Sequence, residues 1–335
     1  MNKRMRVNWV LVLACVALGL VGMLGLVGCG GEGEVGSSES DGSEKMVVYV
    51  TFYPGEFFVD RVGGELVEVM NPVPSDADPI FWRPGSDVLS GYQGAGLIVV
   101  NGAGFEKWVE TVSLPGSRVV SFAGPYEEEW LRYEEAVTHS HGPEGDHSHE
   151  GLDGHTWVDP VNAKVAAGVI RDRLIAEYPD EAGGLQDRFA GLSAELDGLD
   201  AGLQEVTGLL GDGVLLASHP AYNYLAKRYG WEVVNLDLDP EGVLSEEAYG
   251  EIAEAVARSG ARVMLWEGEP LEGTAVRLRE GLGVESVLFS PAEALGDDER
   301  AAGEDYVSIM RGNVERLRGV LEGEGVRERA GGGAS

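Results

Sequence analysis

Short β-rich runs alternate with helical stretches twice along this chain, and one long apolar seam separates the two series. Runs such as residues 46–52 and 213–218 are mostly apolar and rich in β-branched residues, as are strands buried inside a parallel sheet. The stretches between such runs carry apolar residues at helical spacing. The pattern predicts an α/β fold of two βα-type domains, each with a mostly parallel sheet covered by helices on both faces.

The seam places eight apolar residues alternately four and three positions apart, from Leu185 to Leu210. This spacing predicts one rigid helix of roughly 26 to 30 residues, about 40 Å long. A coiled-coil dimer would also fit the spacing. We favour a single helix that packs along its own chain, because four glycines weaken it as a free-standing element. The predicted organisation is an N-terminal domain at 46–180, a linker helix at 181–211 and a C-terminal domain at 212–323.

The N-terminus has the pattern of an export signal. Three basic residues precede an almost wholly apolar stretch at 9–27, and small residues then lead to Cys29. This is typical of a lipoprotein signal peptide at residues 1–28, with Cys29 lipidated and residues 29–45 forming a flexible tether. An uncleaved transmembrane anchor is the alternative. Both interpretations place the remaining chain outside the cytoplasm. At the other end, the polar, Gly-rich residues 324–335 are expected to be disordered.

Composition limits the classes of partner. Cys15 lies inside the apolar stretch, so the mature chain would keep Cys29 alone and hold no disulfide. Its stability must therefore come from hydrophobic cores. The formal net charge of −32 argues against nucleic acid as a partner and is compatible with cationic ligands.

Histidine is concentrated in one acidic segment. Five of the six histidines fall in the predicted His-rich loop at residues 138–155. These five are His139, His141, His147, His149 and His155, and the sixth is His219. Neutral imidazole is the commonest metal ligand in proteins, and short His-rich tracts are typical of metal binding. The segment therefore predicts a metal-handling protein.

Two of these histidines occupy positions suited to a binding site. His155 lies four residues before Asp159, which is the expected N-cap of a helix beginning at Pro160. His219 directly follows the predicted strand at 213–218, and ligands of open α/β sheets bind beyond the carboxyl ends of strands. Each half of the chain contributes one histidine, so we expect the site in the cleft between the domains.

Three segments resemble motifs of the zinc- and manganese-binding ABC-transporter substrate-binding proteins. They are Gly-His-Thr-Trp-Val-Asp-Pro at 154–160, Ala-Ser-His-Pro-Ala-Tyr at 217–222 and Asn-Gly-Ala-Gly-Phe-Glu-Lys-Trp at 101–108. The resemblance implies a lipid-tethered receptor that captures a divalent transition metal and delivers it to ABC-transporter permease and ATPase subunits. It also implies His155 and His219 as ligands. Manganese- and iron-type relatives usually carry Glu at the second position, so His219 favours Zn²⁺ over Mn²⁺.

The chain departs from this family at two ligand positions. The family pattern Asp-Pro-His is replaced by Asp78-Pro79-Ile80, and isoleucine cannot coordinate a metal. The family's late carboxylate is expected near residues 289–291, which contain no Asp. Two histidines alone would leave a tetrahedral zinc two donors short, unless waters complete it.

Three interpretations of this gap stay open. A loop histidine (His139, His141, His147 or His149) completes a zinc site. Alternatively, Asp78, Asp237 or Glu267 supplies an oxygen donor, although Glu267 could instead orient a ligand histidine. In the third interpretation the cleft has lost tight metal binding and holds another cargo against Trp82 and Trp157, which are also plausible core residues.

The sequence favours a binding protein over an enzyme. It contains no His-Glu-x-x-His, no Gly-x-Ser-x-Gly, no phosphate-binding Gly loop and no Cys-x-x-Cys. The alternatives are a manganese or iron receptor of the same family, a surface zinc buffer and a metal-dependent hydrolase. We expect a monomer anchored through Cys29 to the outer face of the bacterial cytoplasmic membrane, at the cell surface or in the periplasm. Because ligating imidazoles must be neutral, metal affinity should fall below about pH 6.5.

Overall fold

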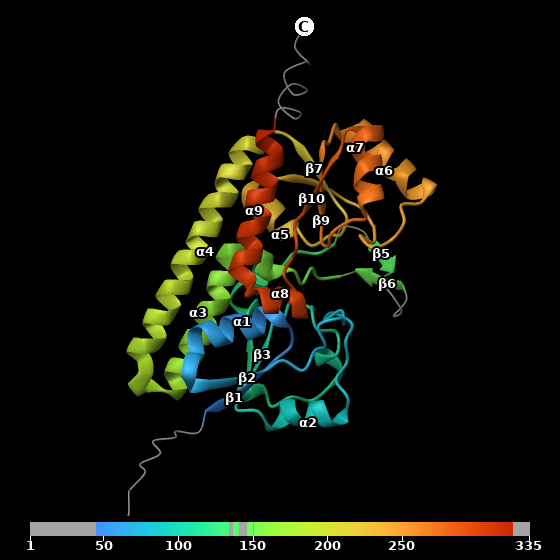
Figure 1. Cartoon of the computed structure of the whole chain (residues 1–335). Helices are drawn as coiled ribbons and strands as arrows, with labels where there is room; N and C mark the ends of the chain where they lie inside the picture. Colours follow the sequence, from blue (N-terminus) through green and yellow to red (C-terminus); the bar gives the residue numbers. More distant parts are fainter. Residues whose placement is uncertain (1–44, 134–136, 141–145, 150, 324–335) are drawn as a thin grey trace, which may run out of the picture. The chain divides into compact units, whose positions relative to one another are not determined.

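The structure, a computed structural model, describes residues 45–133, 137–140, 146–149 and 151–323 (Figure 1). The described residues belong to one compact unit. The strands are β1 (Met46–Val50), β2 (Val67–Met70), β3 (Leu97–Val100), β4 (Val119–Ser121), β5 (Val137–Ser140), β6 (Asp146–His149), β7 (Val214–Ala217), β8 (Glu232–Asn235), β9 (Val263–Trp266) and β10 (Glu285–Leu288). The α-helices are α1 (Tyr53–Gly63), α2 (Ser86–Gly94), α3 (Pro160–Glu177), α4 (Ala182–Leu210), α5 (Asn223–Tyr229), α6 (Glu246–Ser259), α7 (Glu272–Leu282), α8 (Asp297–Ala302) and α9 (Tyr306–Glu322).

Two parallel four-stranded sheets form the centres of two lobes. The N-terminal lobe contains the sheet β2-β1-β3-β4 with α1 to α3, and the C-terminal lobe contains the sheet β10-β9-β7-β8 with α5 to α8. All pairings within these two sheets are parallel, and helices flank both sheets. The predicted α/β fold class is therefore confirmed. A short antiparallel hairpin of β5 and β6 occupies part of the predicted His-rich loop.

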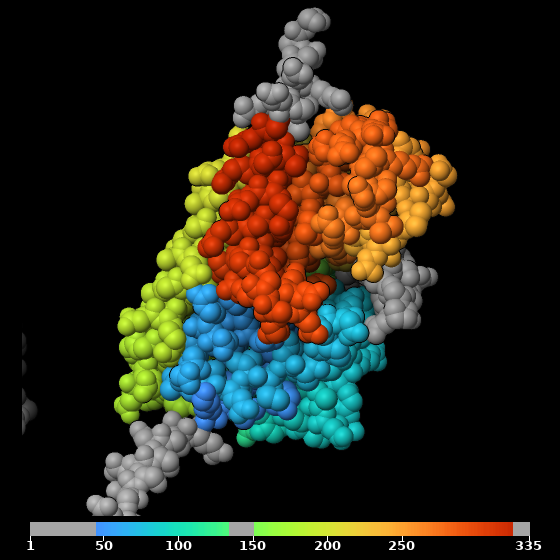
Figure 2. Space-filling view, viewed as in Figure 1, coloured from blue at the N-terminus to red at the C-terminus, as the bar shows by residue number. Residues whose placement is uncertain are grey.

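One hydrophobic core runs through both lobes. It joins residues of the first sheet, such as Val48 and Leu97, to residues of the second, such as Leu215 and Val263. Separate clusters cover the remaining sheet faces, one beside α2 and the other beside α6 and α7. Figure 2 accordingly shows the blue and cyan residues of the N-terminal lobe in direct contact with orange-red residues from the C-terminal part of the chain.

Helix α4 lies along α3 and then along α9 (Figure 1). Six residues of the predicted seam are buried, namely Leu185, Leu192, Leu196, Leu199, Leu203 and Val206. They belong to the core shared by the two lobes, so the seam packs within its own chain. This confirms the long linker helix as an element and removes the need for a coiled-coil partner.

The apolar spacing of residues 299–322 predicts one continuous helix, but the structure divides this stretch between α8 and α9. Gly303 ends α8 in the left-handed conformation with φ of 79°, which favours glycine. Asp305 then begins α9, and its side chain accepts a hydrogen bond from Ser308 N at 2.8 Å. The cap and the glycine together redirect the chain, although the apolar spacing alone predicted one continuous helix.

Several predictions concern residues outside the described ranges. They are the signal peptide, the lipidated Cys29, the tether, His141 and the tail at 324–335. Among the residues that the structure does describe, no helix is long and apolar enough to cross a membrane.

Candidate metal centre

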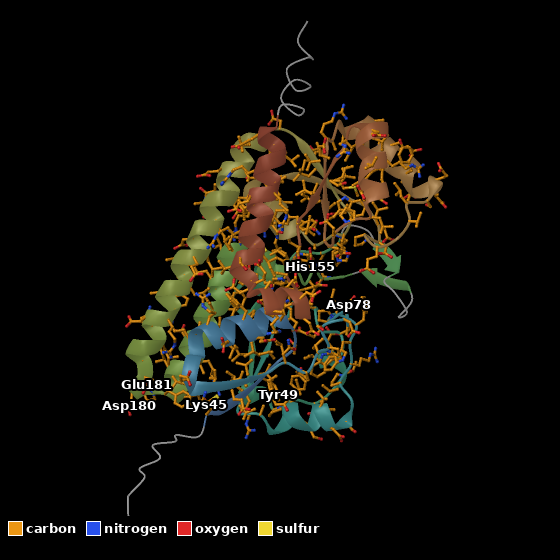
Figure 3. All side chains as sticks on the ribbon, viewed as in Figure 1. Lys45, Tyr49, Asp78, His155, Asp180 and Glu181 are labelled. Carbon is orange, nitrogen blue, oxygen red and sulfur yellow. The ribbon has the colours of Figure 1, made fainter. Side chains whose placement is uncertain are left out.

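His155 is buried at the junction of the two lobes (Figure 3). Asn101, just beyond the carboxyl end of β3, holds the backbone on both sides of it. The Asn101 amide donates to Gly154 O at 2.7 Å, and its oxygen accepts from the Thr156 hydroxyl at 2.7 Å. The carboxylate of Glu106 accepts from Asn101 N at 2.6 Å, so the Asn-Gly-x-Gly-x-Glu segment fixes the position of His155.

The His155 ring is oriented by a carboxylate that the sequence analysis missed. Asp153 Oδ1 lies 2.9 Å from His155 Nδ1 and accepts from His155 N at 3.0 Å. The Tyr133 hydroxyl donates to the same oxygen at 3.1 Å. In a neutral ring Nδ1 then carries the proton, and Nε2 presents its lone pair on the opposite side.

His219 comes from the C-terminal lobe and lies beside His155. It follows β7 beyond its carboxyl end, as predicted, and is 5% exposed. The centroids of the His155 and His219 rings are 5.4 Å apart, with the ring planes at 81°. The structure therefore brings together the two histidines that the sequence singled out. Glu267, which follows β9, has Oε2 at 3.5 Å from His219 Nδ1.

Glu293 is the acidic residue that the sequence analysis did not find. Its Oε2 lies 3.9 Å from His155 Nε2 and, within the described part of the chain, accepts no hydrogen bond. Glu293 thus places a carboxylate near His155 two residues beyond the stretch 289–291, where the family's carboxylate was expected. The preceding loop is fixed because Trp157 Nε1 donates to Pro291 O at 2.8 Å and Ala292 N donates to the Ser290 hydroxyl at 3.1 Å. No motif spacing marks Glu293 in the sequence.

A cavity of about 300 Å³ opens at His219 and Glu293, which both approach His155. His219, Glu267 and Glu293 line it from the C-terminal lobe, and Asp78 and Ile80 line it from the N-terminal lobe. Asp78 Oδ1 accepts from Ile80 N at 2.8 Å. Ile80 is only 5% exposed and joins the core, so no donor replaces the family histidine at that position.

The negative charges of the acidic side chains around the cavity repel one another. Burial and, to a smaller extent, the charges of Asp78, Asp239 and Asp237 together raise the pKa of Glu267 to about 8. Burial also raises the pKa of Glu293 well above its ordinary value, and Asp78 and Glu267 add to the shift. A bound cation would lower the free energy of the ionised carboxylates, so the cavity favours positively charged ligands.

The structure does not group all of the predicted ligand residues around one point. In the described ranges no three His, Cys, Asp or Glu side chains are grouped closely enough to hold a metal ion as they stand. His139 pairs with His147 across the β5–β6 hairpin, and His149 pairs with Val137. The structure does not describe the side chains of these hairpin residues.

Trp82 and Trp157 are not arranged as a cargo-binding surface. Trp157 is 1% exposed and packs against Phe52 and Phe105, with ring centroids 4.7 Å away in each case. Trp82 packs against Trp108. The interpretation of both as packing residues is therefore the better one.

Known proteins share this architecture over most of its length. The zinc-binding lipoprotein AdcA of Streptococcus pneumoniae (strain TIGR4) is 28% identical over 302 residues, covering 86% of this chain and 58% of that protein. The chain thus spans less than two thirds of AdcA. The high-affinity zinc uptake system protein ZnuA of Bacillus subtilis is 26% identical over 297 residues, covering 85% of this chain and 90% of that protein.

Solved structures agree with the fold. The Zn(II)-bound ZnuA-like domain of Streptococcus pneumoniae AdcA superposes with a TM-score of 0.70 at 25% identity, covering 84% of this chain and 100% of that domain. Residues 48–320 match the family described as the periplasmic component A of the zinc-uptake complex. This match covers both lobes, the linker helix and every residue of the cavity, and the chain belongs to that family.

Proposed function

We propose that this protein is the extracytoplasmic receptor of a zinc ABC transporter and binds Zn²⁺ as cargo in the cavity between its lobes. The observation that carries the proposal is the 5.4 Å separation of the His155 and His219 rings, which come from opposite lobes. Imidazole nitrogen and carboxylate oxygen are among the donors that zinc accepts in tetrahedral sites. The similarity to zinc-binding AdcA and ZnuA supports the same cargo.

His155 Nε2, His219 and Glu293 are the three protein donors in this proposal. The 3.9 Å between His155 Nε2 and Glu293 Oε2 leaves room for an ion that contacts both atoms at about 2.0–2.2 Å. Asp78, Glu267, a loop histidine or water supplies the fourth donor. Adjustment of side-chain rotamers must complete the geometry, because the present arrangement does not close around one point.

A receptor role follows from this ligand set and from the family. Cargo has to be released to a permease, so a site with exchangeable fourth ligation suits delivery. We propose permease and ATPase subunits as partners, a lipid anchor on Cys29 and a location on the outer face of the cytoplasmic membrane. The acidic His-rich loop would collect metal before it reaches the cavity.

Calorimetric zinc titration of the chain from Gly30 onward tests the proposal. Wild-type protein should bind one Zn²⁺ tightly, with Mn²⁺ a weak competitor. His155→Ala and His219→Ala should each weaken this site by 100-fold or more, whereas His147→Ala in the hairpin should have a much smaller effect, at most that of losing the exchangeable fourth donor. Weak multiple binding that neither cavity variant changes would overturn the proposal.

The three carboxylates favour one second candidate, a manganese receptor. Hard oxygen donors suit Mn²⁺, and the cavity presents Asp78, Glu267 and Glu293 beside two histidines. In the same titration, tighter binding of Mn²⁺ than of Zn²⁺ would support this candidate instead.

Removing residues 138–150 separates collection from binding. If the loop only collects metal, the truncated protein should capture zinc more slowly and keep the affinity of the tight site. Loss of the tight site on truncation would show that the loop supplies a ligand.

A further inference from the structure

Asp153 contacts the two histidine-bearing segments at once. It is fully buried, and its Oδ1 holds His155 through the ring and the backbone, as described above. Its other oxygen, Oδ2, accepts from Asn223 Nδ2 at 2.9 Å. Asn223 is the first residue of α5, in the C-terminal lobe. One carboxylate therefore joins a segment of the N-terminal lobe to a helix of the C-terminal lobe.

Asn223 extends this link to His219. Its amide also donates to Pro220 O at 3.3 Å, and Pro220 directly follows His219 in the chain. Asn235 Nδ2, at the end of β8, donates to Asn223 Oδ1 at 3.1 Å and fixes the orientation of the amide. The contacts thus run from the His155 ring through Asp153 and Asn223 to the backbone beside His219.

The backbone of Asp153 is held by the same helix. The Tyr224 hydroxyl donates to Asp153 O at 3.1 Å and accepts from Leu131 N at 3.1 Å. Asp153 N in turn donates to Leu131 O at 2.9 Å. Because both the side chain and the backbone are fixed, Asp153 has little freedom to follow a moving imidazole.

We propose that Asp153 is a positioning residue for metal capture, which selects the Nδ1–H tautomer of His155 and, through Asn223, sets the spacing of His155 and His219. The inference rests on the proposed zinc function but concerns residues that lie outside the cavity. A carboxylate offers two acceptor oxygens, and this position uses both. Asparagine offers one, so Asp153→Asn must lose either the hold on His155 or the link to Asn223.

The first arm measures zinc affinity by calorimetry. Loss of a carboxylate that orients a ligand histidine typically weakens metal binding 10- to 100-fold. We expect Asp153→Asn to fall in that range with unchanged stoichiometry, and Asn223→Ala to lose several-fold with the His155 contact retained. Asp159→Asn is the matched control, because Asp159 is equally buried, caps α3 and pairs with Arg228 without a hydrogen bond to His155. It should lower thermal stability and leave zinc affinity within about twofold.

The second experiment determines the tautomer of His155 in the metal-free protein. Long-range ¹H–¹⁵N spectra of metal-free protein at about pH 8, assigned with His155→Ala, report which nitrogen of His155 carries the proton. The expected result is Nδ1–H in wild type and in Asn223→Ala. An Nε2–H tautomer in wild type, or unchanged zinc affinity in folded Asp153→Asn, would overturn the inference. If wild type binds no zinc, the proposed function fails, and the tautomer still tests the role of Asp153.

Discussion

Ile80 lines the cavity from the N-terminal lobe without offering a donor atom. Its side chain is buried among core residues, while its backbone N–H is taken by Asp78. The zinc site proposed here consequently draws its protein nitrogen donors from His155 and His219. Position 80 itself therefore contributes no ligand to the proposed site.

Ile80→His should tighten zinc binding by about tenfold or more, because an imidazole replaces an exchangeable fourth ligand. Calorimetry with a competing chelator measures the change. Ile80→Leu is the control, since it keeps an apolar side chain of the same volume and adds no donor. Equal zinc affinity in the two variants would contradict the assignment of this wall of the cavity.

Glu106 stabilises the loop that positions His155. Its carboxylate accepts from Asn101 N and Gly102 N, whereas glutamine has only one acceptor oxygen and would turn an NH₂ group toward an N–H. Glu106→Gln should therefore cost about 1–3 kcal/mol of unfolding free energy. Urea denaturation tests this, with the exposed Glu110→Gln expected to change stability by less than about 0.5 kcal/mol. Equal stability of the two variants would argue against this role.

The sequence allowed His155 and His219 to be placed because strand ends and helix caps have local signals. Glu293 had none, since its approach to His155 depends on a loop fixed by distant residues, including Trp157. Asp153 was equally hidden, because its two partners come from opposite lobes. Local sequence patterns were sufficient to predict the helices and strands that carry the two histidines. The positions of Glu293 and Asp153 depend on contacts between residues far apart in the sequence, which no local pattern reveals.

Among the elements, helix α4 follows the N-terminal lobe and precedes the C-terminal lobe, and it packs against both α3 and α9. Its buried seam was predictable from apolar spacing alone, whereas the break between α8 and α9 was not, because Gly303 interrupts an otherwise helical pattern. The buried face of a helix is marked by many apolar residues at regular spacing, so its sequence signal is strong. A break between two helices depends on one or two residues, so its sequence signal is weak.

Leu203→Ala should destabilise the protein by about 2–5 kcal/mol, because Leu203 is completely buried between the packed helices. Leu209→Ala on the same helix is the control, since Leu209 is 38% exposed. Chemical denaturation of both variants gives the comparison. Similar losses would mean that α4 does not bury its seam against the rest of its own chain.

At the scale of the whole molecule, the crowded carboxylates make stability depend on pH. The pKa of Glu267 is raised to about 8 in the folded protein, above its unfolded value near 4.5. The folded state thus binds the proton more tightly, and this contribution to stability is lost as pH rises from about 4.5 to 8. The charges of Asp78, Asp239 and Asp237 contribute to this shift, and the raised pKa of Glu293 affects stability in the same direction.

Metal-free protein in EDTA should accordingly lose at least about 1 kcal/mol of unfolding free energy between pH 6 and pH 8. Glu267→Gln should show a smaller loss over the same interval. Urea denaturation at the two pH values measures both proteins. A wild type that is equally stable at both, or an unchanged loss in the variant, would contradict the electrostatic account of the cavity.

Anomalous diffraction at the zinc edge, on crystals of the zinc-loaded protein, shows where the ion binds. We expect one strong peak in the cavity, about 2.0–2.2 Å from a nitrogen of each of His155 and His219 and from a Glu293 oxygen. A cavity with no peak, and zinc found only on the His-rich hairpin, would contradict it.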